Sequence, residues 1–346
     1  MDLSLFYFAH DSTAPGQAGR YELLIEGAKL ADRSGLAAVW TPERHFDPFG
    51  GAYPNPAVLG AAVAMSTQRV GIRAGSVVAP LHHPARIAEE WSVVDNLSGG
   101  RAGIAFASGW NTVDFALRPE NHADRRTLVR DTAEEVRRLW RGETHATTDG
   151  LGRPVEIRTY PPAVQPELPV WLTSAGGVDT FRAAARMKAG ILTHLLGQSL
   201  EEVAAKIAEY RRVAAEEHDG WSGHVVLMLH TLLGDDVDQV REQVREPFTN
   251  YLKSSANLTA KSFTGKDMDL SELNADDMDY LAARAFDRYF ETGGLFGSVE
   301  RAAELLPHIR ALGVDEIGCL VDFGVESRAV LDGIDKLGKL NEIISR

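Results

Sequence analysis

Short apolar segments alternate with longer amphipathic segments along the whole sequence. The apolar segments are rich in valine, isoleucine, leucine and aromatic residues, and most are apolar at successive positions. This pattern is typical of parallel strands that are covered on both faces. We expect strands at residues 3–8, 36–41, 70–78, 101–107, 169–173, 190–194, 225–233 and 314–322.

The segments between these strands predict helices. In residues 20–34 the apolar positions recur at helical spacing, and Gly35 follows as a stop signal. Further helices are expected at 83–97, 125–141, 179–188, 199–218, 236–252, 299–312 and 325–343. Eight strand–helix repeats favour an α/β fold of the (β/α)8 TIM-barrel type. An open doubly wound sheet would normally carry G-x-G-x-x-G after its first strand, and AHDSTAPGQAG lacks that pattern.

Two segments interrupt the repeat. Residues 142–168 contain TDGLGRP between short alternating stretches, which predicts a hairpin with a glycine-rich turn. Residues 253–298 are long, polar and acidic, with a helix expected at 276–291. A long insertion without a core of its own is often an active-site lid. We therefore expect one barrel domain over residues 1–346 with these two insertions.

Composition and net charge argue against some classes of partner. The net charge of −13 argues against a nucleic-acid partner, because phosphate neutralisation needs basic surfaces. The lone Cys319 and the lack of a long apolar run or a basic leader predict a cytoplasmic protein with no membrane partner. One local basic group is either the solvated face of a helix or a docking surface for an acidic partner: Arg125, Arg126, Arg130, Arg137, Arg138 and Arg141.

In such a barrel the reacting groups gather at the carboxyl ends of the strands. The segment TPERHF, directly after the second expected strand, places Glu43, Arg44 and His45 at that end. A charged neighbour can tune the pKa of His45 toward neutrality for proton transfer, although a structural turn is the alternative. His194 ends the sixth expected strand in apolar surroundings, which suits a buried structural histidine as well as a functional one.

The segment TSAGGVDTF after the fifth expected strand is the best candidate for binding a phosphate. Small residues let backbone amides approach an anion, and the following helix directs its positive end toward it. The candidate residues are Thr173, Ser174, Ala175, Gly176, Gly177 and Thr180. A tight turn that simply requires glycine is the alternative. Metal catalysis is not expected, because the first expected strand is followed by only one histidine, His10, and because His82 and His83 are adjacent and cannot both face one ion in regular structure. A serine hydrolase is not expected either, because G-x-S-x-G is absent.

These residues, in this order, resemble the bacterial luciferase-like flavin-dependent monooxygenases. The similarity covers about residues 1–340 and is strongest in TPERHFDPFGGAYPNP, LHHPARIAEEWSVVDNLSGGRAGIAFASGW, PVWLTSAGG and THLLGQSLEE. The resemblance is closest to a branch tied to natural-product biosynthesis. It implies a barrel that binds reduced FMN, with the phosphate near Ser174–Gly177 and a non-proline cis peptide at Ala74–Gly75 beside the flavin. It also implies flavin contacts from Phe8, Ser108 and His194.

Two residues depart from luciferase itself. Arg44 stands where luciferase has its catalytic histidine, and arginine cannot shuttle protons at neutral pH. An acid–base role therefore moves to His45 or His194, while Arg44 and Glu43 orient the histidine or hold an acidic substrate group. Ser108 stands where luciferase places an arginine near the phosphate, so amides and hydroxyls must contribute more.

The resemblance implies a two-component monooxygenase. A separate flavin reductase supplies reduced FMN, and one atom of O2 goes to a small-molecule or carrier-protein-tethered substrate. Phe8, Trp110 and Leu195 would form dry walls, and a homodimer is expected with helix 83–97 as one face. The alternatives are a deazaflavin (F420)-dependent oxidoreductase of the same fold, a catalytically silent flavin-binding protein, and a metal-dependent barrel hydrolase.

Overall fold

Eight parallel strands close into a barrel in this computed structural model, which describes residues 1–8, 19–254 and 275–345. Pairing of the first and last strands completes the circle. The strands in order are β1 (Asp2–Phe6), β2 (Ala38–Thr41), β3 (Gly71–Val78), β4 (Ala102–Ala107), β7 (Val170–Ser174), β8 (Gly190–His194), β9 (Val225–Gly234) and β11 (Glu316–Leu320). The predicted (β/α)8 barrel is confirmed, and each expected strand lies within a few residues of its predicted place.

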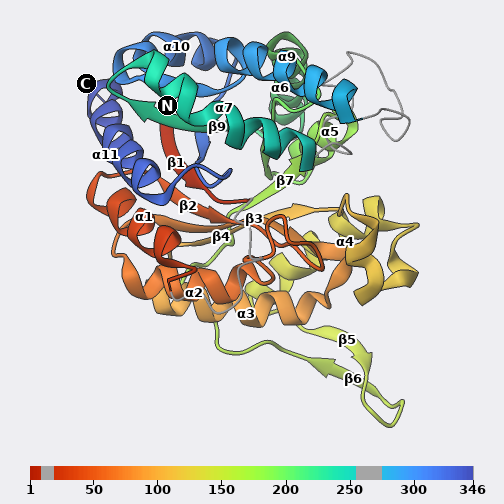
Figure 1. Ribbon diagram of the computed structural model, residues 1–346. Coiled ribbons are helices and arrows are strands. Elements are labelled where there is room, and N and C mark those ends of the chain that lie inside the picture. Colours follow the sequence, from red (N-terminus) through yellow and green to blue (C-terminus); the bar gives the residue numbers. More distant parts are fainter. Residues whose placement is uncertain (9–18, 255–274, 346) are drawn as a thin grey trace.

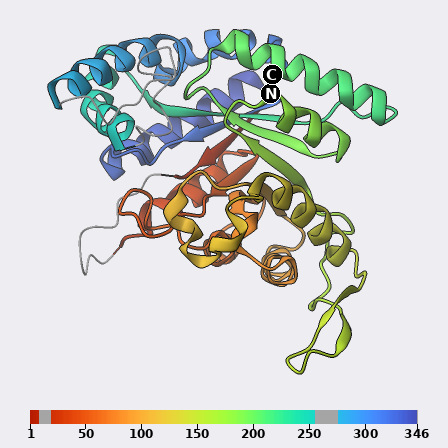
Figure 2. The same cartoon turned by 90° about the vertical axis from the view of Figure 1, so that its right-hand side faces the viewer.

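Helices surround this barrel on the outside (Figures 1 and 2). Their bounds are α1 Glu22–Arg33, α2 Pro56–Ser66, α3 Pro84–Ser98, α4 Arg125–Trp140, α5 Val178–Arg186, α6 Leu200–Glu217, α7 Val237–Ser254, α9 Ala275–Thr292, α10 Val299–Ala311 and α11 Ser327–Ile344. Short 3-10 helices lie at Ala79–Leu81, Thr112–Leu117 and Pro119–Asn121. Among the described residues, no helix has both the length and the apolar character that crossing a membrane requires.

Two elements were not predicted. Helix α2 carries apolar residues on all its faces, so it lacks the amphipathic period used to find the others. Its start is nevertheless encoded locally, because Asn55 Oδ1 accepts hydrogen bonds from the amides of Ala57 and Val58, and Pro56 occupies the first turn. Strand β10 (Leu295–Ser298) extends the outer half of β9 in parallel register, at the end of the predicted insertion.

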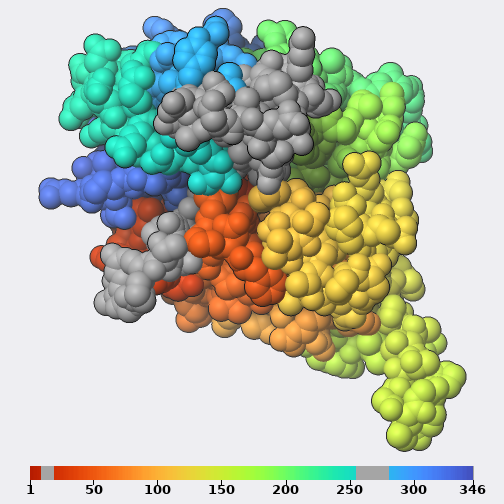
Figure 3. All heavy atoms as spheres, turned by 45° about the vertical axis from the view of Figure 1, so that its right-hand side comes forward, coloured from red at the N-terminus to blue at the C-terminus, as the bar shows by residue number. Residues whose placement is uncertain are grey.

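The first insertion is the predicted hairpin. Strands β5 (His145–Thr148) and β6 (Pro154–Ile157) pair antiparallel and stand away from the barrel, as the yellow-green arm of Figure 3 shows. The second insertion begins at the end of α7, and its described part forms α9 and β10. Residues 255–274, which form part of the expected lid, lie outside the described residues.

The amino-terminal end of the barrel interior is filled by a polar network. Glu316 is fully buried, and its Oε1 accepts hydrogen bonds from Ser4 Oγ at 2.6 Å and from Trp40 Nε1 at 3.0 Å. Arg73 Nη1 donates to the other carboxylate oxygen at 2.7 Å. The Arg73 guanidinium also stacks on Trp40 and Trp171, at 4.9 and 4.7 Å from the ring centroids. This closed end leaves the carboxyl ends of the strands, here called the mouth, as the open end of the barrel.

Candidate active site

Glu43 is the centre of a hydrogen-bonded cluster at the mouth. It follows β2, its side chain is buried, and its Oε1 lies 2.8 Å from His45 Nε2 and 2.5 Å from His82 Nε2. Its Oε2 accepts a hydrogen bond from the Val78 amide at 2.7 Å. One carboxylate oxygen is thus shared by two imidazoles. The bond between Glu43 and His45 agrees with the predicted orienting role of Glu43.

The charges of this cluster support one another. Burial alone would raise the pKa of Glu43, but hydrogen bonds from His45, His82 and the Val78 amide outweigh it and hold that pKa below its ordinary value. Burial lowers the pKa of His82, and the bond to Glu43 outweighs this and raises it. His82 is therefore a second site where this cluster can hold a proton. Sequence reasoning placed the segment APLHHP, which contains His82, at the carboxyl end of the third expected strand, but the only role it weighed for His82 was that of a metal ligand.

Arg44 points away from its two neighbours, as consecutive residues in extended chain do. Within the described part of the chain it forms no hydrogen bond or ion pair with Glu43 or His45. Its guanidinium carbon lies 5.1 Å from the ring centroid of Phe8, 5.0 Å from that of Phe49 and 4.7 Å from that of Trp110. Its Nη2 donates to the Phe49 carbonyl at 3.0 Å. The expected role of Arg44 in orienting His45 therefore finds no contact in this geometry.

A mostly apolar cavity of about 160 Å³ opens at the mouth. Seven predicted site residues line it: Phe8, Glu43, Gly75, Ser108, Thr173, Ala175 and His194. Sequence reasoning missed several further lining residues, namely Asp114, Met228 and Tyr251. His45 and Arg44 instead border a neighbouring surface hollow, so the Glu43 carboxylate connects His45 to the cavity. Leu195, expected as a dry wall, is buried but does not line this cavity.

The floor of this cavity lies on β3. The non-proline cis peptide joins Gly75 to Ser76, so the expected position at Ala74–Gly75 is wrong by one residue. Ala74 lies deeper in the strand and is fully buried. Gly75 must be glycine, because a Cβ atom there would lie 2.8 Å from the ring of Phe6. The Ser76 hydroxyl is 2.6 Å from that of Thr173, which places two hydroxyls on the cavity wall.

His194, at the end of β8, is a neutral hydrogen-bonding group. Its Nδ1 accepts a hydrogen bond from the Leu196 amide at 3.2 Å, so in the neutral ring Nε2 carries the proton. Burial lowers the pKa of His194 to about 4, and the positive charge of Lys206 acts in the same direction. His194 can therefore donate a hydrogen bond into the cavity at neutral pH. It is a poorer proton carrier than the cluster around Glu43.

The loop from Ser174 to Gly177 connects β7 to α5 and has an anion-binding form. Ser174 Oγ accepts a hydrogen bond from the Gly176 amide at 3.2 Å, and Gly176 has a φ of +132°, which favours glycine. Gly177 precedes the first turn of α5, where Thr180 donates its amide to the Gly177 carbonyl. Backbone amides at the start of α5 face the region beyond this loop without partners inside the helix.

A cation lies beside this loop that sequence reasoning missed. Lys206 Nζ donates to Gln198 Oε1 at 2.7 Å, and a Cβ atom placed on Gly176 would lie 3.4 Å from that oxygen and 3.6 Å from that nitrogen. Gln198 Nε2 also donates to Thr193 Oγ1 at 3.1 Å. Lys206 lies on α6, which follows the next strand, so only the fold brings it to the loop. Its ammonium group places a positive charge beside Gly176.

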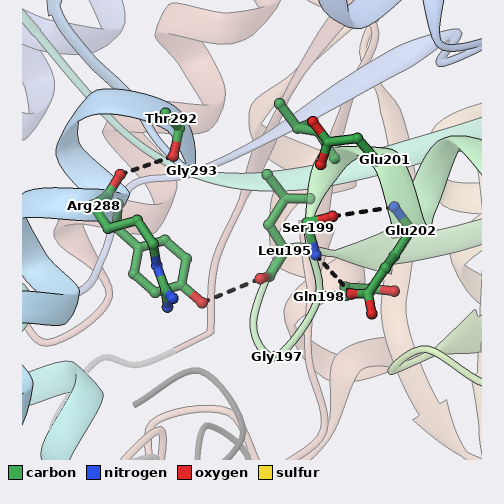
Figure 4. Close-up of a pocket in the computed structure, with 11 residues that line it drawn as sticks. Leu195, Gly197, Gln198, Ser199, Glu201, Glu202, Arg288, Thr292 and Gly293 are labelled. Carbon is green, nitrogen blue, oxygen red and sulfur yellow. Dashed lines mark hydrogen bonds between the residues drawn. The ribbon is translucent and has the colours of Figure 1, made fainter. Parts of the chain in front are cut away.

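An outer hollow of about 500 Å³ lies between the β8–α6 connection and α9, and Gly197, Gln198 and Gly293 are among the residues that line it (Figure 4). The Tyr289 hydroxyl donates to the Leu195 carbonyl at 3.1 Å. Ser199 and Glu202 form a reciprocal capping box that begins α6. Helix α9, which belongs to the second insertion, is thereby attached to the β8–α6 connection that contains Gln198.

The comparisons with known proteins now decide the family. The profile of the luciferase-like monooxygenase family matches residues 1–316. The chain belongs to the luciferase-like monooxygenase family. The predicted resemblance is confirmed, and the protein is an oxidoreductase of the monooxygenase type. The oxygenase component of a flavin-dependent trigonelline monooxygenase from Acinetobacter baylyi is 25% identical over 351 residues, which covers 99% of this chain and 95% of that protein.

Solved structures of this fold agree. The monooxygenase RslO1 from Streptomyces bottropensis superposes with a TM-score of 0.79 at 22% identity and covers 100% of both chains. The oxygenating constituent of 3,6-diketocamphane monooxygenase from Pseudomonas putida, solved with FMN, gives 0.75 at 16% identity over 98% of this chain and 97% of that one. An F420-dependent secondary alcohol dehydrogenase gives 0.69 at 15% identity over 98% and 97%. These likenesses establish the fold of the luciferase-like family and include two kinds of cofactor.

Among the described residues, one group has the spacing of metal ligands: Asp2, His224 and Glu316. It lies at the amino-terminal end of the barrel, opposite the mouth. Its histidine is already oriented, because Trp171 Nε1 donates to His224 Nδ1 at 2.9 Å and the proton of the neutral ring then lies on Nε2. Glu316 is paired with Arg73. The group is explained by the polar network of the closed end.

Proposed function

We propose that this luciferase-like family member is the oxygenase component of a two-component monooxygenase that uses reduced FMN and O2. The observation that supports this best is one juxtaposition at the mouth. The apolar cavity on β3 and β7 has the anion-suited loop at Ser174–Gly177 on one side and the Glu43 cluster on another. A flavin has the matching parts, namely a flat apolar ring system and an anionic tail.

The residues present fit FMN. The Gly177 amide, the Thr180 hydroxyl and the Lys206 cation would hold its phosphate, while Ser174 Oγ keeps the Gly176 amide in place within the loop. Phe8, Gly75, Ser76, Ser108 and His194 would contact the ring system. When bound, reduced FMN supplies the two electrons that O2 chemistry requires.

The chain itself excludes water and manages protons. Phe8, Leu196 and Met228 give the cavity its apolar walls, which protect reactive species from water. Glu43 faces this cavity and carries His45 and His82, so the cluster can accept a proton at a ring nitrogen and return it. His194 orients the bound group by donating a hydrogen bond from Nε2.

The proposal extends to partners. A separate flavin reductase supplies the reduced FMN, and this is supported by the Acinetobacter relative, which is the oxygenase component of a flavin-dependent monooxygenase. The substrate is a small molecule or a carrier-tethered intermediate. The basic group on α4 gives the carrier only limited support, because three of its arginines are committed within the chain. Arg137 donates to the Met187 carbonyl, Arg138 pairs with Glu143, and Arg141 pairs with Glu143 and Glu167.

We also propose a homodimer and one functional domain over residues 1–346. Helix α2 and the adjacent α3 expose apolar side chains on their outer faces: Val58, Met65, Val93 and Leu97. Covering them with a second copy would remove that apolar surface from water. Gel filtration with light scattering tests this directly, and a Met65→Asp exchange would shift a dimer toward the monomer.

An F420-dependent oxidoreductase remains a second candidate because a solved structure of that activity shares the fold. A silent flavin-binding protein is a third. Oxygen uptake and product labelling together separate the three candidates. In this assay the protein is mixed with substrate candidates, a flavin reductase, FMN and isotopically labelled O2. The proposal predicts label in the product. Hydride transfer with F420 and no label in any product would support the second candidate, and FMN binding without coupled product would support the third.

A further inference from the structure

We propose that Arg44 is the recognition site for an ionised carboxylate on an otherwise apolar substrate. This inference rests on the proposed function, since it specifies the substrate class of the same mouth. It is based on two observations. The Arg44 guanidinium is buried among aromatic rings, and its Nη1 has no hydrogen-bond partner among the described residues.

The aromatic rings around Arg44 limit which groups can form hydrogen bonds with its guanidinium. The rings of Phe8, Phe49 and Trp110 contact the guanidinium at centroid distances of 5.1, 5.0 and 4.7 Å. Such contacts stabilise a cation but satisfy none of its N–H groups. The side chain is only 2% exposed. Its hydrogen bonds must therefore come from groups that approach within this aromatic enclosure.

One nitrogen of the Arg44 guanidinium has no hydrogen-bond partner among the described residues. Nη2 uses one N–H on the Phe49 carbonyl at 3.0 Å. Nη1 is buried and has no hydrogen-bond partner among the described residues. A buried donor without an acceptor costs free energy, and more so when the group is charged. A ligand acceptor at Nη1 would remove that cost.

The charge is also uncompensated. Within the described ranges, no carboxylate lies within ion-pair distance of Arg44, although Asp114 contributes a longer-range attraction. Asp114 is itself bonded to Asn111 Nδ2 at 2.8 Å. Elsewhere the stacked arginines do have acids: Arg73 pairs with Glu316, and Arg241 pairs with Asp287 and Glu291. Among the described residues Arg44 thus has no ion-pair partner, although Asp114 and Asp47 attract it at longer range. Guanidinium with carboxylate is a strong planar pair.

The position of Arg44 suits substrate rather than the flavin phosphate. Arg44 follows β2, whereas the anion-binding loop follows β7, with β3 and β4 between them in the barrel. Phe8 and Trp110 touch the guanidinium and also line the apolar cavity. Trp110 is 41% exposed and follows Gly109, so its ring can turn aside without unpacking the core. A ligand in the cavity would then present its carboxylate to Nη1.

Calorimetric titration of the flavin-free protein tests this inference. The probes are benzoate, phenylacetate, cinnamate and octanoate, each compared with its own primary carboxamide in low-chloride buffer. We expect at least one acid to bind about tenfold or more tighter than its amide. Arg44→Met should abolish the preference, and Arg44→Lys should retain part of it. The matched control Arg241→Met removes another aromatic-stacked arginine, at 4.7 Å from Phe290, and should keep the full preference.

Equal binding of every acid and its amide, or a preference that survives in Arg44→Met, would overturn the inference. Thermal melts confirm that each variant is folded. An anaerobic titration of Arg44→Met with reduced FMN separates this inference from the proposed function. If Arg44→Met keeps its affinity for reduced FMN, a substrate role for Arg44 is supported. If only this variant loses FMN affinity, Arg44 binds the flavin, and the inference is overturned. Absence of FMN binding in the unaltered protein would instead count against the proposed function alone.

Discussion

The barrel buries two glutamates at its opposite ends, and their surroundings differ. Glu316, at the closed end, is held by Ser4, Trp40 and Arg73, and the charges of Arg73 and His224 outweigh burial to keep its pKa low. Glu43, at the mouth, is held by His45, His82 and one amide. The partners of Glu316 include a permanent cation. The partners of Glu43 are two imidazoles and an amide, and none of them is a permanent cation.

The two ends of the barrel also differ in whether their buried polar groups have hydrogen-bond partners. Near the mouth, Arg44 Nη1 and His230 Nε2 are buried without hydrogen-bond partners among the described residues, whereas the carboxylate of Glu316 has partners on both oxygens. Buried polar groups without partners weaken a fold and are retained where function requires them. We therefore propose that the closed end serves stability, whereas the mouth gives up some stability for binding and proton transfer.

The largest effect is expected from breaking the closed end. Arg73→Met removes the cation from a fully buried carboxylate and should lower the free energy of unfolding by about 3–5 kcal/mol, measured by urea denaturation. The double variant Arg73→Met with Glu316→Leu should recover much of that loss, because the uncompensated charge is gone. A single variant with unchanged stability would contradict a structural role for this end.

The next effect is on catalysis at the mouth. Glu43→Gln keeps the shape but removes the charge that supports His45 and His82, and should reduce turnover by roughly 10²-fold with reduced-FMN affinity little changed. Labelled-oxygen incorporation and anaerobic titration measure the two quantities. Exchange of the exposed Glu26 to glutamine is the control. Unaltered turnover in Glu43→Gln would show that the cluster is structural.

A smaller effect of opposite sign is expected at Arg44. Arg44→Met removes a buried charge that has no counter-ion in the described structure, so the free energy of unfolding should rise by about 1 kcal/mol. Urea denaturation of the flavin-free protein measures it. A clear loss of stability would mean that the protein itself already satisfies this cation.

The smallest effect is a pH dependence. The folded-state pKa of His82 is raised by Glu43 despite burial, so its contribution is complete below the unfolded value near 6.5. That contribution is lost as pH rises through the folded-state pKa. The stability difference between the unaltered protein and His82→Gln should therefore be larger at pH 6 than at pH 9. An equal difference at both values would rule out the charged His82–Glu43 pair.

Sequence patterns predicted the barrel because each strand carries its own apolar signal. They missed α2, whose apolar residues occupy every face, and β10, whose four residues rely on pairing with β9. They placed the loop at Ser174–Gly177 by its small residues, yet missed Lys206, because contact between separate strand–helix units is not local. The bond from Glu43 to His82 was missed for the same reason. The side chains of Arg44 and His45 point in different directions, and the segment TPERHF alone does not determine these directions.

The most direct test of the account is an anaerobic titration with reduced FMN and reduced riboflavin, which differ by the phosphate. The account predicts that FMN binds about tenfold or more tighter than riboflavin, and that Lys206→Met removes most of the difference while leaving riboflavin binding unchanged. Equal affinities for the two flavins, or no association of reduced FMN, would contradict a phosphate seat at Ser174–Gly177.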